Sequence, residues 1–177
     1  ALAGSDAKGI VLAAEGPNSS SHLLLEPKET APTLAELCRV VEDCPVPVVF
    51  VGQGVLAGAA AEVALAARAR LAKPGFRIAF PDVTLGLCPA GGTTRRLPRL
   101  IGARAAMRLL ITGKSVPASE ALSLGLIDGI TETGPLASGI RLARALAVSD
   151  MLHRKEPDPA VWSSAVAEAR QHPSART

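Results

Sequence analysis

Two carboxylates lie where the sequence could support acid–base chemistry. Glu62 is in the small apolar run VLAGAAAEVALAARA, residues 55–69, with no cation three or four positions away to pair with it on a helix. Asp82 comes twenty residues later, directly after the strand-like residues 77–80. Two neighbouring carboxyls in a dry site have separated pKa values and can divide acid and base roles. The alternative is a solvated glutamate and a turn-forming aspartate.

Small residues precede Glu62 and would leave the backbone open to a ligand. Gly58, Ala59 and Ala60 begin the expected helix, where backbone N–H groups can stabilise a developing oxyanion. Further along, PAGGTTRR (89–96) is either a flexible loop or a helix N-terminus that binds an anion. It lacks the GKT or GKS ending of a phosphate-binding loop.

The elements that must position these groups alternate between short apolar runs and helical stripes. The predicted strands are residues 9–16, 45–54, 76–81 and 126–130. The predicted helices are residues 33–44, a helix from Gly58, 103–113, a short helix from Pro117 or Ser119 to Gly125, 135–147 and 158–169. Residues 85–102 are expected to be a Gly/Pro-rich loop that leads into a basic helical turn. Alternating strands and helices indicate an α/β fold.

Length and composition indicate one domain with a substantial core. The chain has 177 residues, 48% of them apolar, and a formal net charge of +3. No run reaches the ~18 uninterrupted apolar residues of a membrane span, and no basic-then-apolar signal begins the chain. We therefore expect a soluble, cytoplasmic protein with no membrane partner. Because a strand begins at residue 9, we expect the sequence to start inside a domain.

Cysteines and histidines do not indicate a metal centre. The three cysteines are odd in number and lack CxxC spacing, and the three histidines are scattered. We expect small buried thiols, no disulfide framework, no metal and no permanently bound cofactor.

Arginines gather within residues 93–108. Nucleic acid is a poor partner for them, because aromatic residues for base stacking make up only 2% of the chain. A phosphate or an acidic partner fits better. A further hypothesis keeps an anion- or nucleic-acid-binding surface, formed by Arg95, Arg96, Arg99 and Arg104.

The order of the segments resembles the crotonase superfamily, the enoyl-CoA hydratase/isomerase family. PVPVVFVGQGVLAGAAAEVALAARARLA (45–72) is similar to the family's strand, glycine-rich turn and glutamate-bearing helix. Residues 76–130, from FRIAFPDV to LIDGI, are similar without gaps to its most recognisable block. The match runs from Gly9 to Ile130.

This resemblance implies a repeated β-β-α spiral with C-terminal helices and an acyl-CoA thioester as substrate. Coenzyme A would enter as part of the substrate and not as a cofactor. The implied reaction is hydration of 2-enoyl-CoA to 3-hydroxyacyl-CoA, with an oxyanion hole that polarises the thioester carbonyl. Family members form homotrimers or hexamers, for which the helices 135–147 and 158–169 would be the assembly elements.

Site residues are carried over from the resemblance by position. Glu62 and Asp82 match the two catalytic acids, and the backbone N–H groups of Leu23 and Ala59 match the oxyanion hole. The residues expected to bind substrate are Gly58, Pro89 and Ala90.

The resemblance also divides the chain. Residues 1–132 would form the crotonase-like core, without the family's N-terminal strands, and residues 133–177 a C-terminal helical segment. That segment looks like the one that follows the hydratase domain in multifunctional fatty-acid oxidation proteins. A dehydrogenase domain comes next in those proteins.

Three departures from the family keep alternatives open. Asp82 replaces the usual glutamate and is one methylene shorter. The turn AGAAAE has alanines in place of glycines of the family's turn, and their methyl groups crowd the approach of the backbone to substrate. NSSSHLLLEP places His22 where the family has a glycine, whose freer backbone His cannot adopt without cost. The alternatives are an enoyl-CoA isomerase, which needs one acid, and an inactive crotonase-like protein that binds CoA or has a structural role.

Overall fold

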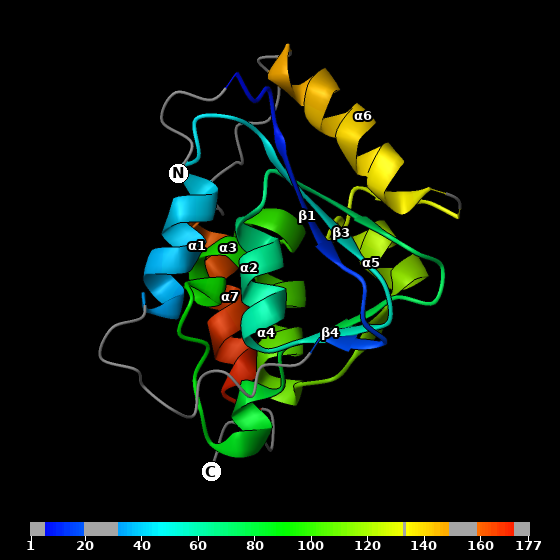
Figure 1. Ribbon diagram of the computed structural model, residues 1–177. Helices are drawn as coiled ribbons and strands as arrows, with labels where there is room; N and C mark the ends of the chain where they lie inside the picture. The colour runs from blue at the N-terminus through cyan, green and yellow to red at the C-terminus, as the bar shows by residue number, and fades with distance from the viewer. Residues whose placement is uncertain (1–5, 20–31, 133, 149–158, 172–177) are drawn as a thin grey trace.

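Two four-stranded sheets organise the protein, which Figure 1 shows as a computed structural model. The structure describes residues 6–19, 32–132, 134–148 and 159–171. The first sheet is parallel throughout, in the order β1 (Ile10–Ala14), β3 (Val48–Gly52), β5 (Ala69–Ala72), β8 (Gly129–Ile130). The second has the order β2 (Asn18–Ser19), β4 (Val55–Ala57), β6 (Arg77–Ala79), β7 (Val116–Pro117), with only its β6–β7 pair antiparallel.

The chain visits the two sheets in turn and then forms a helix. β1 and β2 precede α1 (Leu34–Glu42), and β3 and β4 precede α2 (Ala59–Ala66). β5 and β6 precede the 3-10 helix η2 (Pro81–Leu85). This order confirms the predicted α/β fold with a repeated β-β-α spiral.

Both faces of the first sheet are covered, because side chains alternate along each strand. On β3, Val48 and Phe50 pack into the main core, which includes residues of α2 and α4. Val49 and Val51 pack on the opposite face against α6 (Pro135–Ala147). Figure 1 shows α6 on one side of β1 and β3, and α1 and α2 on the other.

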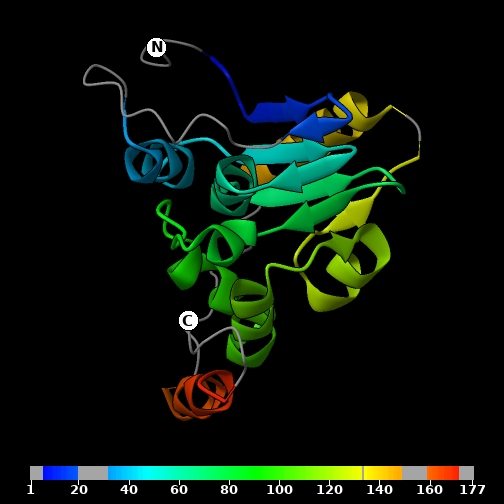
Figure 2. The same ribbon diagram turned by 90° about the horizontal axis from the view of Figure 1, so that it is seen from below.

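The remaining helices follow the site-bearing part of the chain. They are α3 (Thr93–Ile101), α4 (Ala103–Thr112), α5 (Ala118–Leu124) and α7 (Pro159–Ala169). Gly113 (φ +61°) and Gly125 (φ +79°) end α4 and α5 in the left-handed conformation, as predicted. Figure 2 shows α7 at the edge of the molecule beside α4, with which it makes direct contacts.

The structure corrects two expectations about the elements. The helix predicted from Gly58 is confirmed at its start but ends at Ala66, because Ala69–Ala72 is a strand that pairs with β3. Arg68 therefore lies outside α2. The expected basic turn is a full helix, α3, which contains Pro98.

Several expectations from the sequence can be compared with the structure only in part. Cys38 is buried, as expected, but Cys88 is exposed and Cys44 intermediate, and all three are free thiols. His22, His153 and His172 lie outside the described residues. No described helix is long and apolar enough to cross a membrane. The proposed boundary at residues 132–133 falls just before α6, which packs on the core sheet.

Candidate active site

Glu62 lies in the first turn of α2 and is 0% exposed. Gly58 precedes the helix at φ +56°, and its carbonyl accepts the Glu62 backbone N–H at 3.0 Å. α2 is apolar on every side, as expected of a helix buried in the core. Glu62 is therefore the charged exception inside a buried helix, and the solvated alternative does not hold.

The carboxylate of Glu62 is held by the chain that leads into α3. Its Oε2 accepts the Gly91 N–H at 2.8 Å, the Thr93 hydroxyl at 2.7 Å and the Thr93 N–H at 3.4 Å. Its Oε1 accepts the Ala90 N–H at 3.2 Å. Neutral donors thus satisfy the buried group, as burial of a polar side chain requires.

Burial raises the pKa of Glu62, and the hydrogen bonds from Thr93 and Gly91 act in the opposite direction. The negative charge of Asp82 raises the same pKa further. Asp82 is therefore close enough for its charge to influence the ionisation of Glu62. Twenty residues separate the two acids in sequence, and β5 and β6 lie between them.

Asp82 occupies the first turn of η2, immediately after β6. Its side chain is partly exposed, but the Oδ2 atom is buried and has no hydrogen-bond partner among the described residues. A buried carboxylate oxygen without a partner is uncommon in proteins and is explained either by strain or by a ligand that completes it. Asp82 therefore offers a free acceptor beside Glu62.

α1 forms the wall behind the glycine-rich loop. A Cβ atom on Gly91 would lie 3.0 Å from Cys38 Sγ, from Glu62 Oε2 and from Leu34 Cγ. Gly91 therefore permits the close approach of the loop to the carboxylate. Burial raises the pKa of the Cys38 thiol to about 11, so this neighbour stays neutral at physiological pH.

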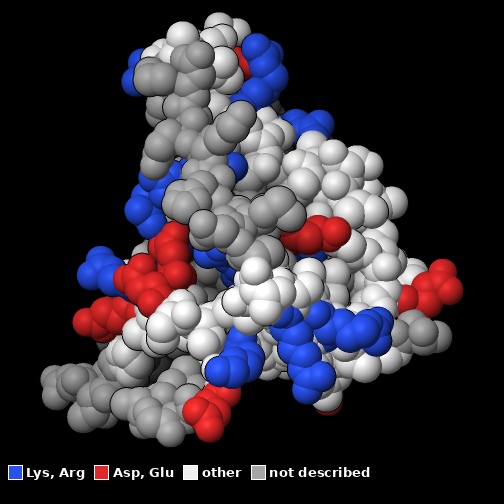
Figure 3. All heavy atoms as spheres, turned by 90° about the horizontal axis from the view of Figure 1, so that it is seen from above, with Lys and Arg blue, Asp and Glu red and all other residues white. Residues whose placement is uncertain are grey.

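Arg96 braces the same loop from its other side. Its guanidinium contacts Glu42 at 2.6 Å and donates to the Gly91 carbonyl, while its buried Nε has no partner among the described residues. Arg95 also binds Glu42, at 2.8 Å, and Arg104 binds Glu168. Three of the four arginines expected to meet an anion thus pair with acids of their own chain. Figure 3 shows basic and acidic side chains side by side on one face.

The other predicted site residues take different places. Gly58 and Ala59 are buried at the start of α2, and Ala90 contacts Glu62 through its N–H. Pro89 is partly buried beside it. Leu23, the other predicted oxyanion donor, lies outside the described residues, as does His22. The described residues include no group of three His, Cys, Asp or Glu side chains that could hold a metal ion.

Sequence reasoning missed Thr93 and Gly91 as partners of Glu62. The run PAGGTTRR was recognised as a possible anion-binding loop, but the anion that it binds is the chain's own carboxylate. A hydroxyl residue directly after two glycines and at the start of a helix was the available signal.

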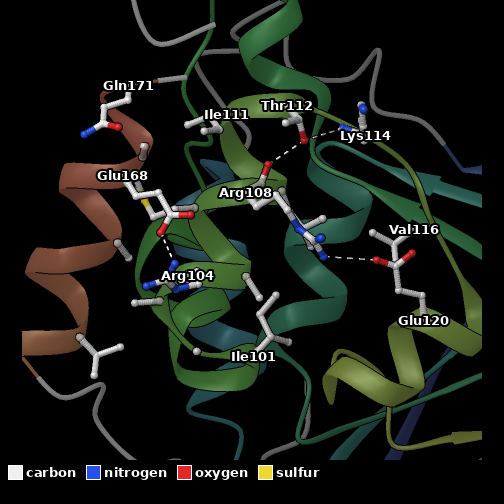
Figure 4. Close-up of a pocket in the computed structure, with 18 of the residues that line it drawn as sticks. Ile101, Arg104, Arg108, Ile111, Thr112, Lys114, Val116, Glu120, Glu168 and Gln171 are labelled. Atoms are coloured by element: carbon white, nitrogen blue, oxygen red, sulfur yellow. Dashed lines mark hydrogen bonds and ion pairs between the residues drawn. The ribbon is translucent and has the colours of Figure 1, made fainter. Parts of the chain in front are cut away.

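A separate groove of about 1070 Å³ lies between α4 and α7 and does not include Glu62 or Asp82. Figure 4 shows Arg104 contacting Glu168 and Arg108 contacting Glu120 at its rim. The second pair is 3.4 Å apart. Because neither predicted acid lines it, the groove is separate from the candidate active site.

Comparison with known proteins gives the family. Residues 20–156 match the model of the enoyl-CoA hydratase/isomerase family. A peroxisomal bifunctional enzyme of Danio rerio is 46% identical over 101 residues, which cover 57% of this chain and 14% of that protein. The chain thus spans only a small part of that relative.

Solved structures agree with this match. An enoyl-CoA hydratase from Bacillus anthracis is 30% identical, with a TM-score of 0.61 over 66% of this chain and 46% of that one. DspI from Pseudomonas aeruginosa has the same fold, with a TM-score of 0.70 over 97% of this chain and 67% of that one, at 23% identity. The sequence match, the shared fold and the β-β-α spiral lead to one conclusion: the chain belongs to the enoyl-CoA hydratase/isomerase family, within the crotonase superfamily.

Proposed function

We propose that this chain hydrates 2-enoyl-CoA to 3-hydroxyacyl-CoA, with Glu62 and Asp82 as its catalytic pair. The proposal rests on one observation: two carboxyls in different environments interact electrostatically. Glu62 is fully buried and held by four hydrogen bonds, whereas Asp82 has a buried oxygen without a partner among the described residues. Their electrostatic coupling supports a shared task.

The hydration divides one water molecule between two carbons. The water oxygen bonds to C3 while Glu62 takes a proton from it, and the electrons of the C2–C3 double bond move toward the thioester. Asp82 gives a proton to C2, so that the pair holds the same number of protons before and after. Burial raises the pKa of Glu62, but the hydrogen bonds from Thr93 and Gly91 oppose this rise and favour the carboxylate form, and on this ground we assign Glu62 the base.

Negative charge builds on the thioester oxygen during this step. We propose that the backbone N–H groups of Ala59 and Leu23 stabilise it, since Ala59 begins α2 next to Glu62 and the helix start favours negative charge. Gly58, Pro89 and Ala90 would flank the acyl group. Coenzyme A is then carried in and out with the substrate.

The test is hydration of crotonyl-CoA, followed as loss of the enoyl absorbance. We expect Glu62→Gln and Asp82→Asn each to lower kcat by about 10²-fold or more, because each removes a proton-transfer group. Glu120→Gln, which changes an exposed acid on α5, is the control and should keep full activity. Activity that survives in both site variants contradicts the assignment.

A second candidate is Δ3,Δ2-enoyl-CoA isomerisation, which needs one acid. The unpartnered Oδ2 of Asp82 favours it, because this oxygen alone could carry a proton from one carbon to another. With a 3-enoyl-CoA substrate, loss of activity in Asp82→Asn but not in Glu62→Gln would select isomerisation. Calorimetric binding of acyl-CoA without turnover of either substrate would select the inactive, CoA-binding alternative.

We also propose that the chain assembles as a homotrimer or hexamer in the cytoplasm, and that it is the hydratase part of a larger fatty-acid oxidation protein. Leu136 and Ile140 support assembly, because they leave apolar surface exposed on α6. The short span of this chain on the bifunctional relative supports the larger protein.

A further inference from the structure

We propose that Thr93 is a positioning residue: its hydroxyl fixes Oε2 of Glu62, so that Oε1 is the oxygen that exchanges protons with the substrate water. The catalytic part of this inference rests on the proposed hydratase function. The structural part, that Thr93 controls the ionisation of Glu62, does not.

The geometry distinguishes the two oxygens of the carboxylate. Oε2 accepts from the Thr93 hydroxyl at 2.7 Å, from the Gly91 N–H at 2.8 Å and from the Thr93 N–H at 3.4 Å. A carboxylate oxygen offers two lone pairs, so the two short bonds occupy Oε2. Oε1 accepts one longer bond, from the Ala90 N–H at 3.2 Å. Oε1 therefore keeps a lone pair for a further donor.

Thr93 is itself held in place. It is the first residue of α3 and is 0% exposed. Gly92 precedes it with φ +90°, a turn that places the Thr93 N–H and hydroxyl on the same carboxylate. A buried hydroxyl with a single defined acceptor loses little freedom when Glu62 changes its charge, which is the requirement for a positioning group.

The hydroxyl opposes the effects that would keep Glu62 protonated. Burial and the charge of Asp82 on η2 raise the pKa of Glu62, and the hydrogen bond from Thr93 is the largest effect that lowers it. Among the residues that the structure describes, Cys38 on α1 and Arg96 on α3 are further ionisable groups near the carboxylate. The Cys38 thiol is neutral, and Arg96 is engaged by Glu42. Thr93 thus favours the carboxylate form that a base requires.

The first experiment measures the ionisation of Glu62 directly, by carbon-13 NMR titration of its side-chain carboxyl, assigned with Glu62→Gln. Thr93→Val keeps the shape and removes the hydroxyl, so the titration midpoint should move to higher pH. Thr93→Ser keeps the hydroxyl and should titrate as the wild type does. Thr94→Val, at the exposed neighbouring position, is the matched control.

Thr93→Ala tests the same point without a second buried methyl group, in case Thr93→Val does not fold. Both hydroxyl-free variants are expected to move the midpoint in the same direction. A midpoint that stays at the wild-type pH in whichever of them folds overturns the inference.

The second experiment measures crotonyl-CoA hydration against pH. A base must be ionised, so activity falls as pH decreases through the pKa of Glu62, and a raised pKa moves this acid limb to higher pH. For Thr93→Val we expect kcat to fall about tenfold while KM changes less than about twofold, with recovery in Thr93→Ser. A purely structural role would leave the acid limb where it is.

The two experiments separate the two proposals. A wild-type chain without hydratase activity overturns the proposed function, while the NMR titration still decides the role of Thr93. Wild-type activity combined with an unchanged midpoint and acid limb in the hydroxyl-free variants overturns the role of Thr93 and leaves the hydratase function standing.

Discussion

Glu62 is fully buried and receives its hydrogen bonds from neutral donors of one segment: the backbone N–H groups of Ala90, Gly91 and Thr93 and the Thr93 hydroxyl. A lysine or arginine in their place would favour the charged carboxylate strongly. Neutral donors satisfy the carboxylate and still allow burial to raise its pKa. This combination keeps a buried acid available for proton exchange, which is what a base in a dry site needs.

Gly91 offers a prediction at the residue scale. Gly91→Ala would place a methyl group 3.0 Å from the Glu62 carboxylate and from the Cys38 sulfur, so the loop or the carboxylate must shift. We expect kcat for crotonyl-CoA hydration to fall at least about tenfold, since small displacements of catalytic groups are costly. Unfolding in urea should show a loss of about 1–3 kcal/mol.

Gly75→Ala is the control for this substitution. A methyl group at Gly75 meets nothing within 4 Å, so both activity and stability should stay close to the wild type. Full activity in Gly91→Ala would show that the loop does not set the position of Glu62.

The site could be predicted from the sequence only where local pattern or resemblance named a position. Glu62 and Asp82 were found in this way, and the structure places them within electrostatic reach of each other. Thr93 was not, because its contact with Glu62 joins residues 31 positions apart and depends on how α3 meets α2. No propensity or periodicity encodes such a contact. The predicted donor Leu23 stays a prediction.

At the scale of elements, strands were recognised where composition is uniformly apolar. Residues 45–54 were predicted to hold a buried strand, and Val48–Gly52 forms one. Ala69–Ala72 was missed, because Arg70 and small alanines lack the pattern of a buried strand. Arg70 is nevertheless buried, since its guanidinium binds Asp128 at 2.9 Å. Asp128, a partner distant in sequence, therefore allows β5 to be buried in spite of its arginine.

This ion pair gives the prediction at the element scale. Arg70 also donates to the carbonyls of Leu126 and Ala67, both at 2.9 Å, so it ties β5 to the turn before β8. Arg70→Leu would remove the guanidinium from these two carbonyls and from Asp128, which would keep only the Arg70 backbone N–H at 2.7 Å, and we expect a loss of about 3 kcal/mol in the free energy of unfolding. Denaturation by urea measures it.

Arg108→Leu is the matched control, because Arg108 and Glu120 form an exposed pair at 3.4 Å. Exposed pairs contribute about 1 kcal/mol or less. Equal losses in the two variants would contradict a special role for the buried pair.

At the scale of the whole molecule, the two faces of the first sheet serve different purposes. One face packs on the helices that carry the candidate site, and the other is closed by α6. Gly139 allows this closure, since a Cβ atom there would lie 2.7 Å from Val51 Cγ2. On the same helix, Leu136 and Ile140 are 47% and 40% exposed. These side chains leave apolar surface on α6 that a second contact would cover.

Assembly of the chain is therefore the prediction at this scale. We expect sedimentation equilibrium to give the mass of a trimer or hexamer, and the double substitution Leu136→Glu with Ile140→Glu to shift the mass to that of one chain. Charged side chains cannot be buried in an apolar contact without a large desolvation cost. Val40→Glu, at a 69% exposed position on α1, is the control and should leave the mass unchanged. A wild-type chain that sediments as a single copy at micromolar concentration would show that α6 does not support assembly.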